Sequence, residues 1–429
     1  MRKFYKRAVV IPLIILFIAI PIIGKIFIDR EIKLNVGINE DNELKGDITF
    51  VSNRTDKREE IQSLINEFEE LYPNVKVNLE LIGDAETILQ RKASVGELPD
   101  VTLVPSTIYK NEYSNYFLPI DDLGFNDNNI YNYDMGTGND SKLYCLNSSV
   151  NWQGVIYNKD IFEDANIEKL PSTIEELFEI CEKLNDYGVT PIAINYRQTW
   201  TMNLWADVIP HLFDNNLCKN AAAGNKTILD SESGMYKSLN LVREIVNRGY
   251  CEEDLLNYDW QQFKNDMSTG KIAMTIWSSD FMYQLEDMGM DPNSIGMFPI
   301  PESIIVKIYG DYKFAVSKKT ENPQVAKEFL KYIFEDNRYS NAVNIMSPLK
   351  GEDTYSNDFI ELNEYDIPIE IYSDYVRNQS VEDAKLEETY LQVKKKNGLD
   401  SSFVQKYIIE DNIEDLIKDT NRKWQESME

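Results

Sequence analysis

The sequence has one histidine and four cysteines among its 429 residues, and these few are not spaced as metal sites or redox centres require. No CxxC pair and no histidine cluster is present, so we expect no metal ion and no cofactor. The GxSxG, HExxH, P-loop and dinucleotide-binding fingerprints are also absent. With 72 acidic residues, close carboxylate pairs arise by chance and do not indicate a glycosidase. We therefore expect a protein that is not an enzyme.

Basic residues are scarce too, because 44 Lys and Arg stand against 72 Asp and Glu, for a formal net charge of -28. Such a charge repels phosphate backbones, which excludes nucleic acid as a partner. Only 15 Pro and 19 Gly are present and 43% of the residues are hydrophobic, so the chain can bury a core and is not disordered. The length predicts two or three domains, with which two large lobes agree, and the absence of repeats and low-complexity linkers favours lobes joined by ordered crossing strands. We expect a monomer.

The amino-terminal end has the pattern of an export signal. Residues 8–23 form a nearly unbroken apolar run that continues through residue 28 and follows four basic residues, Arg2, Lys3, Lys6 and Arg7. Basic residues before an apolar span stay in the cytoplasm, so the later chain should lie on the extracellular face of the cell membrane. Residues 19–27 lack the small-x-small pattern of a cleavage site, which favours an uncleaved transmembrane anchor over residues 1–30 and a linker over 31–46. Pro12 and Pro21 would kink that helix, so a cleaved signal stays the alternative.

The next hundred residues alternate between strand and helix patterns. Residues 47–51 read as a strand, 58–72 have the three-and-four spacing of an amphipathic helix, and 75–81 alternate as a second strand. A further helix over 85–95 and a strand over 100–104 repeat the βαβ unit, which predicts a parallel sheet covered by helices. Ligands bind beyond the carboxyl ends of such strands, so Asn53, Arg54 and Ser106 are candidate binding residues.

The cysteines and the histidine suit packing better than chemistry. Cys181 lies on the apolar face of a helix around residues 177–184, as expected of a buried thiol. A disulfide between Cys218 and Cys251 is left open, because an exported protein can form one. His211 stands beside Pro210 and is expected to pack and not to act as a general base.

Several motifs occur in one order along most of the chain. They are ITFVS at 48–52, FEELYPNVKV at 68–77, GELPDVTLV at 96–104, LYCL at 143–146, IYNKDIFEDANI at 156–167, PSTIEELFEICEKL at 171–184, GVTPIA at 188–193, STGKIAMTI at 268–276 and FAVSKKTENPQVAKEFLKYIF at 314–334. In this order they resemble the extracellular solute-binding proteins of carbohydrate ABC importers, the family that includes the maltose-binding protein. Most of the motifs build the lobes and are not expected to touch ligand.

The resemblance implies an α/β, two-lobed periplasmic-binding-protein type II fold, with a ligand cleft between the lobes and the transmembrane helix before it. Residues 47–146 with 314–347 would form the N-terminal lobe, 147–308 with 350–429 the C-terminal lobe, and 309–313 the hinge crossing. It implies a protein that captures a sugar or oligosaccharide and delivers it to the membrane subunits of an ABC transporter. A ligand sensor, or a binding protein for a peptide or other solute, is the alternative with the same fold.

Sugars present apolar C–H faces that stack on aromatic rings and hydroxyls that need polar partners. By the resemblance, Trp200 matches a position where relatives carry a stacking aromatic. Trp152 and the polar Asn151 are similarly placed at the entry to the second lobe. For each tryptophan, packing within a lobe is the alternative to stacking.

The family carries a tryptophan four residues after the AMTI motif, where this sequence has Asp280, and Trp277 directly follows the motif. Either Trp277 supplies the stacking ring and Asp280 hydrogen-bonds a hydroxyl, or the cleft binds its ligand in a different way. It is an equal alternative that Trp277 packs in the core. Asp311, near the hinge crossing, is a further candidate or part of an ordinary turn. The remaining tryptophans are expected to pack: Trp205, Trp260 and Trp424.

Overall fold

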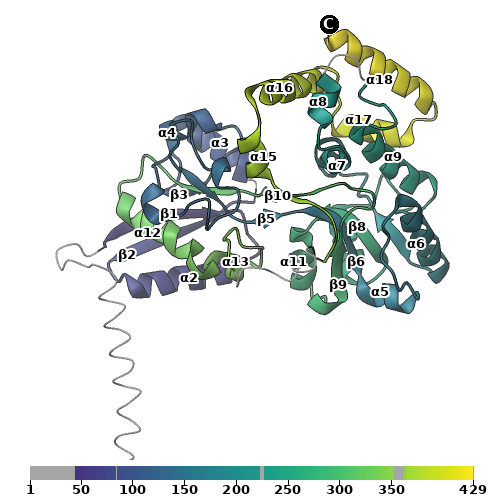
Figure 1. Cartoon of the computed structure of the whole chain (residues 1–429). Helices are drawn as coiled ribbons and strands as arrows, with labels where there is room; N and C mark the ends of the chain where they lie inside the picture. The colour runs from purple at the N-terminus through teal and green to yellow at the C-terminus, as the bar shows by residue number, and fades with distance from the viewer. Residues whose placement is uncertain (1–43, 84, 223–226, 352–361, 363, 429) are drawn as a thin grey trace, which may run out of the picture.

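Two lobes, each built on a β-sheet with its own hydrophobic core, make up most of the protein, and a third, three-stranded sheet lies between them (Figure 1). The computed structural model describes residues 44–428 except 84, 223–226, 352–361 and 363. The expected anchor over residues 1–30 therefore lies outside the described residues. Among the helices that are described, none combines the length and apolarity needed to cross a bilayer.

The N-terminal lobe follows the expected strand–helix alternation. Its elements in chain order are β1 (Gly46–Ser52), α2 (Arg58–Leu71), β2 (Val75–Leu81), α3 (Ala85–Val95), β3 (Val101–Leu103), α4 (Tyr113–Tyr116) and β4 (Cys145–Asn147), joined later by β11 (Lys313–Val316), α12 (Pro323–Phe334) and α13 (Arg338–Val343). The strand order is β2-β1-β3-β11-β4, with β1 parallel to β2 and β3 and with β11 antiparallel to β3 and β4. Aromatic rings fill the core, and Phe329 contacts both Phe50 and Phe68 edge to face with ring centroids 5.1 Å apart.

The C-terminal lobe is built on a mixed four-stranded sheet of order β7-β8-β6-β9. Its strands are β6 (Gln153–Asn158), β7 (Thr190–Ala193), β8 (Ile272–Ser278) and β9 (Ile295–Phe298), and its helices before β9 are α5 (Lys159–Asp164), α6 (Ile174–Tyr187), α7 (Ile209–Phe213), α8 (Leu217–Ala222), α9 (Gly234–Asn247), α10 (Trp260–Ser268) and α11 (Asp280–Asp287). Thr173 starts α6 with a reciprocal capping box to Glu176, which satisfies two backbone N–H groups at the start of the helix.

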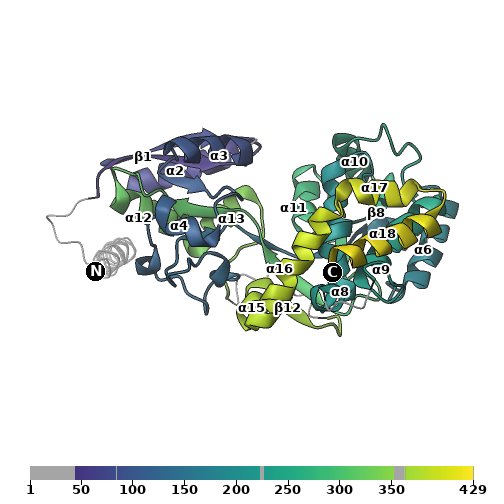
Figure 2. The ribbon, with the colours of Figure 1, turned by 90° about the horizontal axis from the view of Figure 1, so that it is seen from above.

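Three carboxyl-terminal helices return to cover this lobe: α16 (Val381–Lys396), α17 (Ser401–Ile409) and α18 (Ile413–Met428) (Figures 1 and 2). Trp424 on α18 is fully buried, and its Nε1 donates to the carbonyl of Ala221 at 3.1 Å. Arg243 on α9 donates to the carbonyls of Tyr407 and Ile408 at the end of α17. The buried indole and these bonds fix the helices to the lobe.

A small sheet joins the two lobes (Figure 2). Its strands are β5 (Val150–Asn151), β10 (Val306–Gly310) and β12 (Ile369–Ile371), with β10 antiparallel to β5 and parallel to β12. Lys307 on β10 is only 2% exposed, and its charge is met by Glu370 on β12 at 3.2 Å and by the ring of Tyr375. Tyr375 belongs to α15 (Tyr372–Asn378), whose Arg377 forms ion pairs with Asp127 and Asp134 of the N-terminal lobe. We call these three strands the hinge sheet, after the crossing expected at residues 309–313, and the ion pairs of Arg377 tie the neighbouring α15 to the N-terminal lobe.

The four cysteines, Cys145, Cys181, Cys218 and Cys251, are all buried and unpaired, so the disulfide left open between Cys218 and Cys251 is not formed. Burial raises the pKa of Cys145 to about 11, and it raises the pKa values of the other three thiols as well. Buried thiols of this kind are unreactive and serve as small apolar side chains.

Candidate ligand-binding cleft

A cleft of about 570 Å³ opens between the lobes beside the hinge sheet. The N-terminal lobe contributes the turn after β1 and the end of α13, and the C-terminal lobe contributes α10 and α11. Residues from both lobes and from the crossing strands line it: Asn53, Arg54, Asp56, Ser148, Lys264, Asp280, Gln284, Asp287, Met288, Asp311, Tyr312, Tyr339, Asn344 and Ile345.

The N-terminal wall is a turn held in place by hydrogen bonds. The Ser52 and Tyr339 hydroxyls lie 2.9 Å apart, and Ser52 Oγ accepts from the backbone N–H of Arg54 at 3.1 Å. The guanidinium of Arg54 donates to both oxygens of Asp56, at 3.0 and 2.8 Å. This paired contact lowers the pKa of Asp56 and presents Arg54 to the cleft as an oriented donor.

The opposite wall carries two carboxylates whose pKa values are raised. Asp280 opens α11, and burial in the cleft, reinforced by the charge of Asp311, raises the pKa of Asp280 to about 6. Its Oδ2 accepts from Gln284 at 3.4 Å. Asp311 bonds Ser149 through its backbone N–H at 3.1 Å and through its side chain at 3.4 Å, and desolvation by the cleft walls raises its pKa too. Both side chains can accept hydrogen bonds from a ligand.

Three indoles form a tryptophan cluster on the C-terminal lobe, made of Trp200, Trp260 and Trp277. The ring centroids are 4.9 Å apart for Trp200 and Trp260, 5.6 Å for Trp200 and Trp277, and 5.3 Å for Trp260 and Trp277. Trp200 is 52% exposed, whereas the other two rings are partly buried. Beneath Trp260, the rings of Phe263 and Phe281 stack at 5.0 Å and support the cluster.

The tryptophan cluster adjoins the cleft wall along two elements. Trp260 lies four residues before the cleft residue Lys264 on α10, and positions four apart lie on one face of a helix. Trp277 lies at the end of β8, three residues before Asp280. The C-terminal wall therefore passes from carboxylate and ammonium groups to an aromatic surface.

Four of the residues expected from the sequence line the cleft: Asn53, Arg54, Asp280 and Asp311. Trp200 and Trp277 lie in the adjoining tryptophan cluster. Ser106 is not on the cleft lining, and its Oγ and N–H both donate to Glu86. Asn151 lies in the hinge sheet opposite Tyr309, and its side-chain oxygen accepts from Gln153.

Trp152 differs from the expectation of a stacking ring, since it is fully buried and has no surface open to a ligand. It precedes β6, and its ring fits into the core over Gly154, where a Cβ would come within 2.5 Å of the indole. Its backbone bonds Ser279 through both N–H and carbonyl, at 3.2 and 2.9 Å. Trp152 therefore packs the sheet against the start of α11.

Sequence reasoning missed Lys264, Gln284 and Asp287, and it assigned Trp260 to packing. The four-residue spacing of Trp260 and Lys264 on one helix was a signal that could have linked them to a common surface. Nothing comparable marks Asp287, because the groups that it meets belong to the other lobe.

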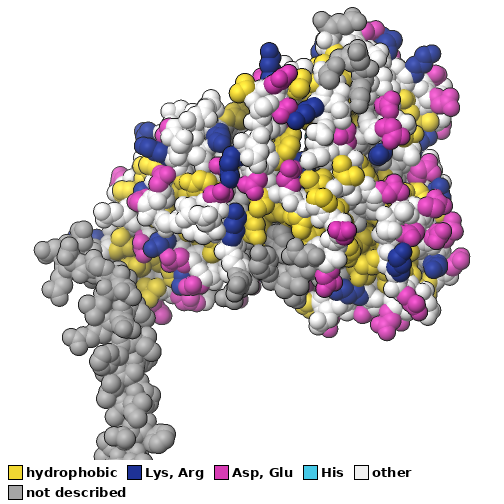
Figure 3. Space-filling model, viewed as in Figure 1, with side chains coloured by type: hydrophobic (Ala, Val, Ile, Leu, Met, Phe, Trp, Pro, Cys, Tyr) yellow, Lys and Arg dark blue, Asp and Glu magenta, His cyan; other side chains and the backbone are white. Residues whose placement is uncertain are grey.

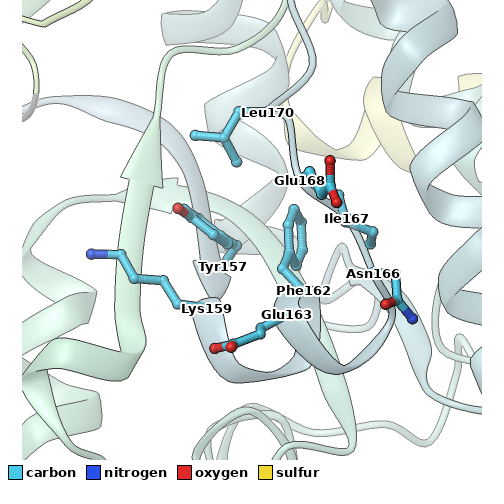
Figure 4. A pocket seen from close by; sticks show the side chains of 8 residues that line it. All are labelled: Tyr157, Lys159, Phe162, Glu163, Asn166, Ile167, Glu168 and Leu170. Atoms are coloured by element: carbon cyan, nitrogen blue, oxygen red, sulfur yellow. The ribbon is translucent and has the colours of Figure 1, made fainter.

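A second hollow, of about 370 Å³, lies on the C-terminal lobe alone (Figure 4). Its lining comes from one continuous stretch, with Tyr157 at the end of β6, Phe162 on α5 and the loop that ends at Leu170. The Tyr157 and Phe162 rings are 4.6 Å apart, so they mostly cover each other. Lobe movement cannot close a groove built from one segment, so the cleft between the lobes is the stronger candidate.

Two α/β lobes, short crossing strands and a polar cleft between the lobes define the class of two-lobed binding proteins. The chain belongs to the bacterial extracellular solute-binding protein family, whose model matches residues 52–336. The resemblance drawn from the sequence motifs is thereby confirmed, as is the α/β periplasmic-binding-protein-like fold.

Individual relatives agree with this assignment. The chain is 24% identical over 315 residues to the multiple sugar-binding protein of Streptococcus mutans serotype c, covering 69% of this chain and 72% of the relative. It is 26% identical over 320 residues to an uncharacterized ABC transporter extracellular-binding protein of Pyrococcus horikoshii, covering 69% and 68%. Among solved structures, a manno-oligosaccharide-specific solute-binding protein of Bifidobacterium animalis subsp. lactis, in complex with mannotriose, has a TM-score of 0.72 at 20% identity and covers 90% of this chain and 95% of its own.

Proposed function

We propose that the protein captures a sugar or oligosaccharide in the cleft between its lobes and delivers it, chemically unchanged, to the membrane subunits of an ABC importer. The observation that carries this proposal is a polar cleft lined by Asp280 and Asp311, with the tryptophan cluster on the same lobe as Asp280 and its Trp277 only three residues before that carboxylate. A cleft that joins an apolar aromatic surface to oriented acceptors matches the two faces of a pyranose ring. The family and the named sugar-binding relative support the same function.

Each group has a role in this binding. Trp200, the most exposed of the three indoles, stacks on the C–H face of the sugar. Asp280 and Asp311 accept hydrogen bonds from hydroxyls on its rim, and Arg54 donates from the opposite lobe. Because the ligand contacts both lobes, it binds the closed arrangement better and shifts the population toward it, with the hinge sheet absorbing the movement.

The setting of this function is also part of the proposal. The lobes work outside the cell membrane as a monomer, held by the amino-terminal segment over residues 1–30. The lobes divide the chain at the hinge crossing over residues 309–313. The high negative charge supports solubility and excludes nucleic acid, and acidic side chains are spread over the C-terminal lobe on the face seen in Figure 3.

The test is a thermal-shift panel of neutral mono- and oligosaccharides on the full chain, with short charged peptides as the competing ligand class. A ligand that binds only the folded state raises Tm, and at about a hundred times Kd it adds roughly 2.7 kcal/mol of stability. We expect a selective saccharide hit, and the sugar should be recovered intact by chromatography. Stabilisation by peptides alone would refute the sugar proposal, and a hydrolysed sugar would refute a purely binding role.

A further inference from the structure

One rim of the cleft is bridged by polar contacts between the lobes. Lys57, directly before α2, places its Nζ 2.5 Å from Asp287 Oδ1 at the end of α11. Arg54 Nη2 lies 3.8 Å from the other oxygen of Asp287. Asn344, after α13, donates to Glu286 Oε2 at 3.2 Å. We call these five residues the interlobe latch.

The carboxylates of the latch depend on the opposite lobe for compensation. Glu286 and Asp287 lie in the last turn of α11, where the negative end of the helix dipole disfavours acidic side chains. α11 carries no basic residue in that turn. Lys57 and Arg54 of the other lobe offset the charge of Asp287, and Asn344 of that lobe donates to Glu286. Separating the lobes would therefore leave both carboxylates without these partners at an unfavourable helix end.

The central ion pair is shielded mainly on its lysine side, because Asp287 is an exposed residue. The Lys57 side chain is 12% exposed and that of Asp287 is 28% exposed. Exposed pairs contribute little because water and salt screen them, whereas a pair with reduced solvent access is screened less. The Lys57 ammonium is therefore screened less than in an ion pair that is exposed at both ends, while the Asp287 carboxylate stays open to solvent.

Arg54 connects the latch to the ligand site. Its guanidinium is held by Asp56 in its own lobe and lies within ion-pair distance of Asp287 across the cleft. Asp287 is thus a positioning residue that meets the ligand-facing Arg54 only when the lobes are close together.

We propose that the interlobe latch biases the ligand-free protein toward the closed arrangement, and that Asp287 positions Arg54 for the ligand. The affinity part of this inference rests on the proposed function, but the conformational part does not. When only a fraction of molecules is competent to bind, the apparent Kd equals the intrinsic Kd divided by that fraction. By raising the fraction in the closed arrangement, the latch lowers the apparent Kd. A neutral ligand makes no charged contact of its own, so the salt dependence of its binding reports the latch.

The conformational test measures the lobe separation in the ligand-free full chain. Spin labels are attached at Ser63→Cys on α2 and Glu179→Cys on α6, both exposed, whereas the four native cysteines are buried. We expect Asp287→Asn, and high salt on the unmodified chain, to shift the distance distribution to longer values. The matched control is Glu244→Gln, which removes a carboxylate paired with Arg248 inside one helix. Identical distributions in the unmodified chain and Asp287→Asn would overturn the inference.

The affinity test is a double-mutant cycle of Lys57→Met and Asp287→Asn, using the saccharide from the thermal-shift panel. We expect each single variant to bind the saccharide on the order of threefold to tenfold more weakly. The double variant should lose little further affinity, because both substitutions remove the same contact. Raising the salt from about 0.05 to 0.5 M should weaken binding to the unmodified chain and leave Asp287→Asn unaffected. Additive losses, or equal salt dependence in the two proteins, would refute the latch.

The two proposals fail in distinguishable ways. If no saccharide binds, the proposed function fails, while the label distances still test the latch. An unchanged far-UV circular dichroism spectrum verifies that the Asp287→Asn variant is folded. If a charged peptide binds and the salt dependence of its binding persists in Asp287→Asn, that dependence comes from the charge of the ligand and not from the latch.

Discussion

Replacing Trp200 by alanine should weaken sugar binding about tenfold while leaving the fold intact. Trp200 is 52% exposed, and its ring is supported edge to face by Trp260 and Trp277. A pyranose that covers one indole face removes roughly 60 Å² of apolar surface from water, which at about 25 cal/mol per Å² is worth ~1.5 kcal/mol. That free energy corresponds to about a tenfold change in Kd.

The assay is isothermal titration with the saccharide that gives the largest thermal shift. Trp200→Phe should lose only about threefold, because a smaller ring keeps part of the stacking surface. Tyr187→Ala is the matched control, since Tyr187 is 48% exposed on the same lobe but belongs neither to the cleft lining nor to the tryptophan cluster. Unchanged affinity in Trp200→Ala, or an equal loss in Tyr187→Ala, would refute the stacking role.

Three further predictions follow from burial and charge. Ionised Asp280 accepts hydroxyl hydrogens, and its pKa is raised to about 6, so sugar affinity measured by titration should fall below pH about 6. Asp280→Asn should show a weaker pH dependence, with the remainder due to Asp311, whose pKa is also raised; an unchanged profile would contradict the role of Asp280. Because the folded chain holds the proton of Asp280 more tightly than the unfolded chain, the ionised carboxylate lowers stability above pH about 6. Burial, with Lys307 close by, lowers the pKa of His211 from 6.5 to about 4, so the folded protein loses stability as the pH falls from 6.5 to about 4. In His211→Phe, the loss of unfolding free energy over this pH range, measured by denaturant titration, should be smaller by up to about 3 kcal/mol. Parallel profiles for the two proteins would contradict this prediction. Because the Trp152 ring is fully buried, Trp152→Ala should lower the free energy of unfolding by about 3 to 5 kcal/mol, measured by urea unfolding. A urea midpoint close to that of the unmodified chain would contradict the packing role.

The parts of the fold that depend on local spacing could be predicted from the sequence. The apolar residues of α2 recur at three and four positions, and Ile61, Leu64, Ile65 and Phe68 are the ones buried. The rule that ligands bind beyond strand ends placed Asn53 and Arg54 correctly beside a cleft.

Other features depend on contacts that no local pattern encodes. Trp152 lies between two short strands, where alternation does not say which face meets solvent, and its packing place depends on the missing side chain of Gly154. Lys57 and Asp287 are 230 residues apart, so their pairing follows only from the arrangement of the two lobes. A tryptophan is found both in cores and on exposed surfaces, so the sequence does not decide the place of Trp260. Only its distances to Trp200 and Trp277 assign it to the tryptophan cluster.

The central claim is that the ligand is held between the two lobes. Its most direct test is backbone hydrogen–deuterium exchange with and without saturating saccharide. Binding in the cleft should slow exchange in both walls at once, over residues 52–57 in the N-terminal lobe and 278–288 in the C-terminal lobe. Slower exchange confined to one lobe, or to the groove over residues 157–170, would contradict the account.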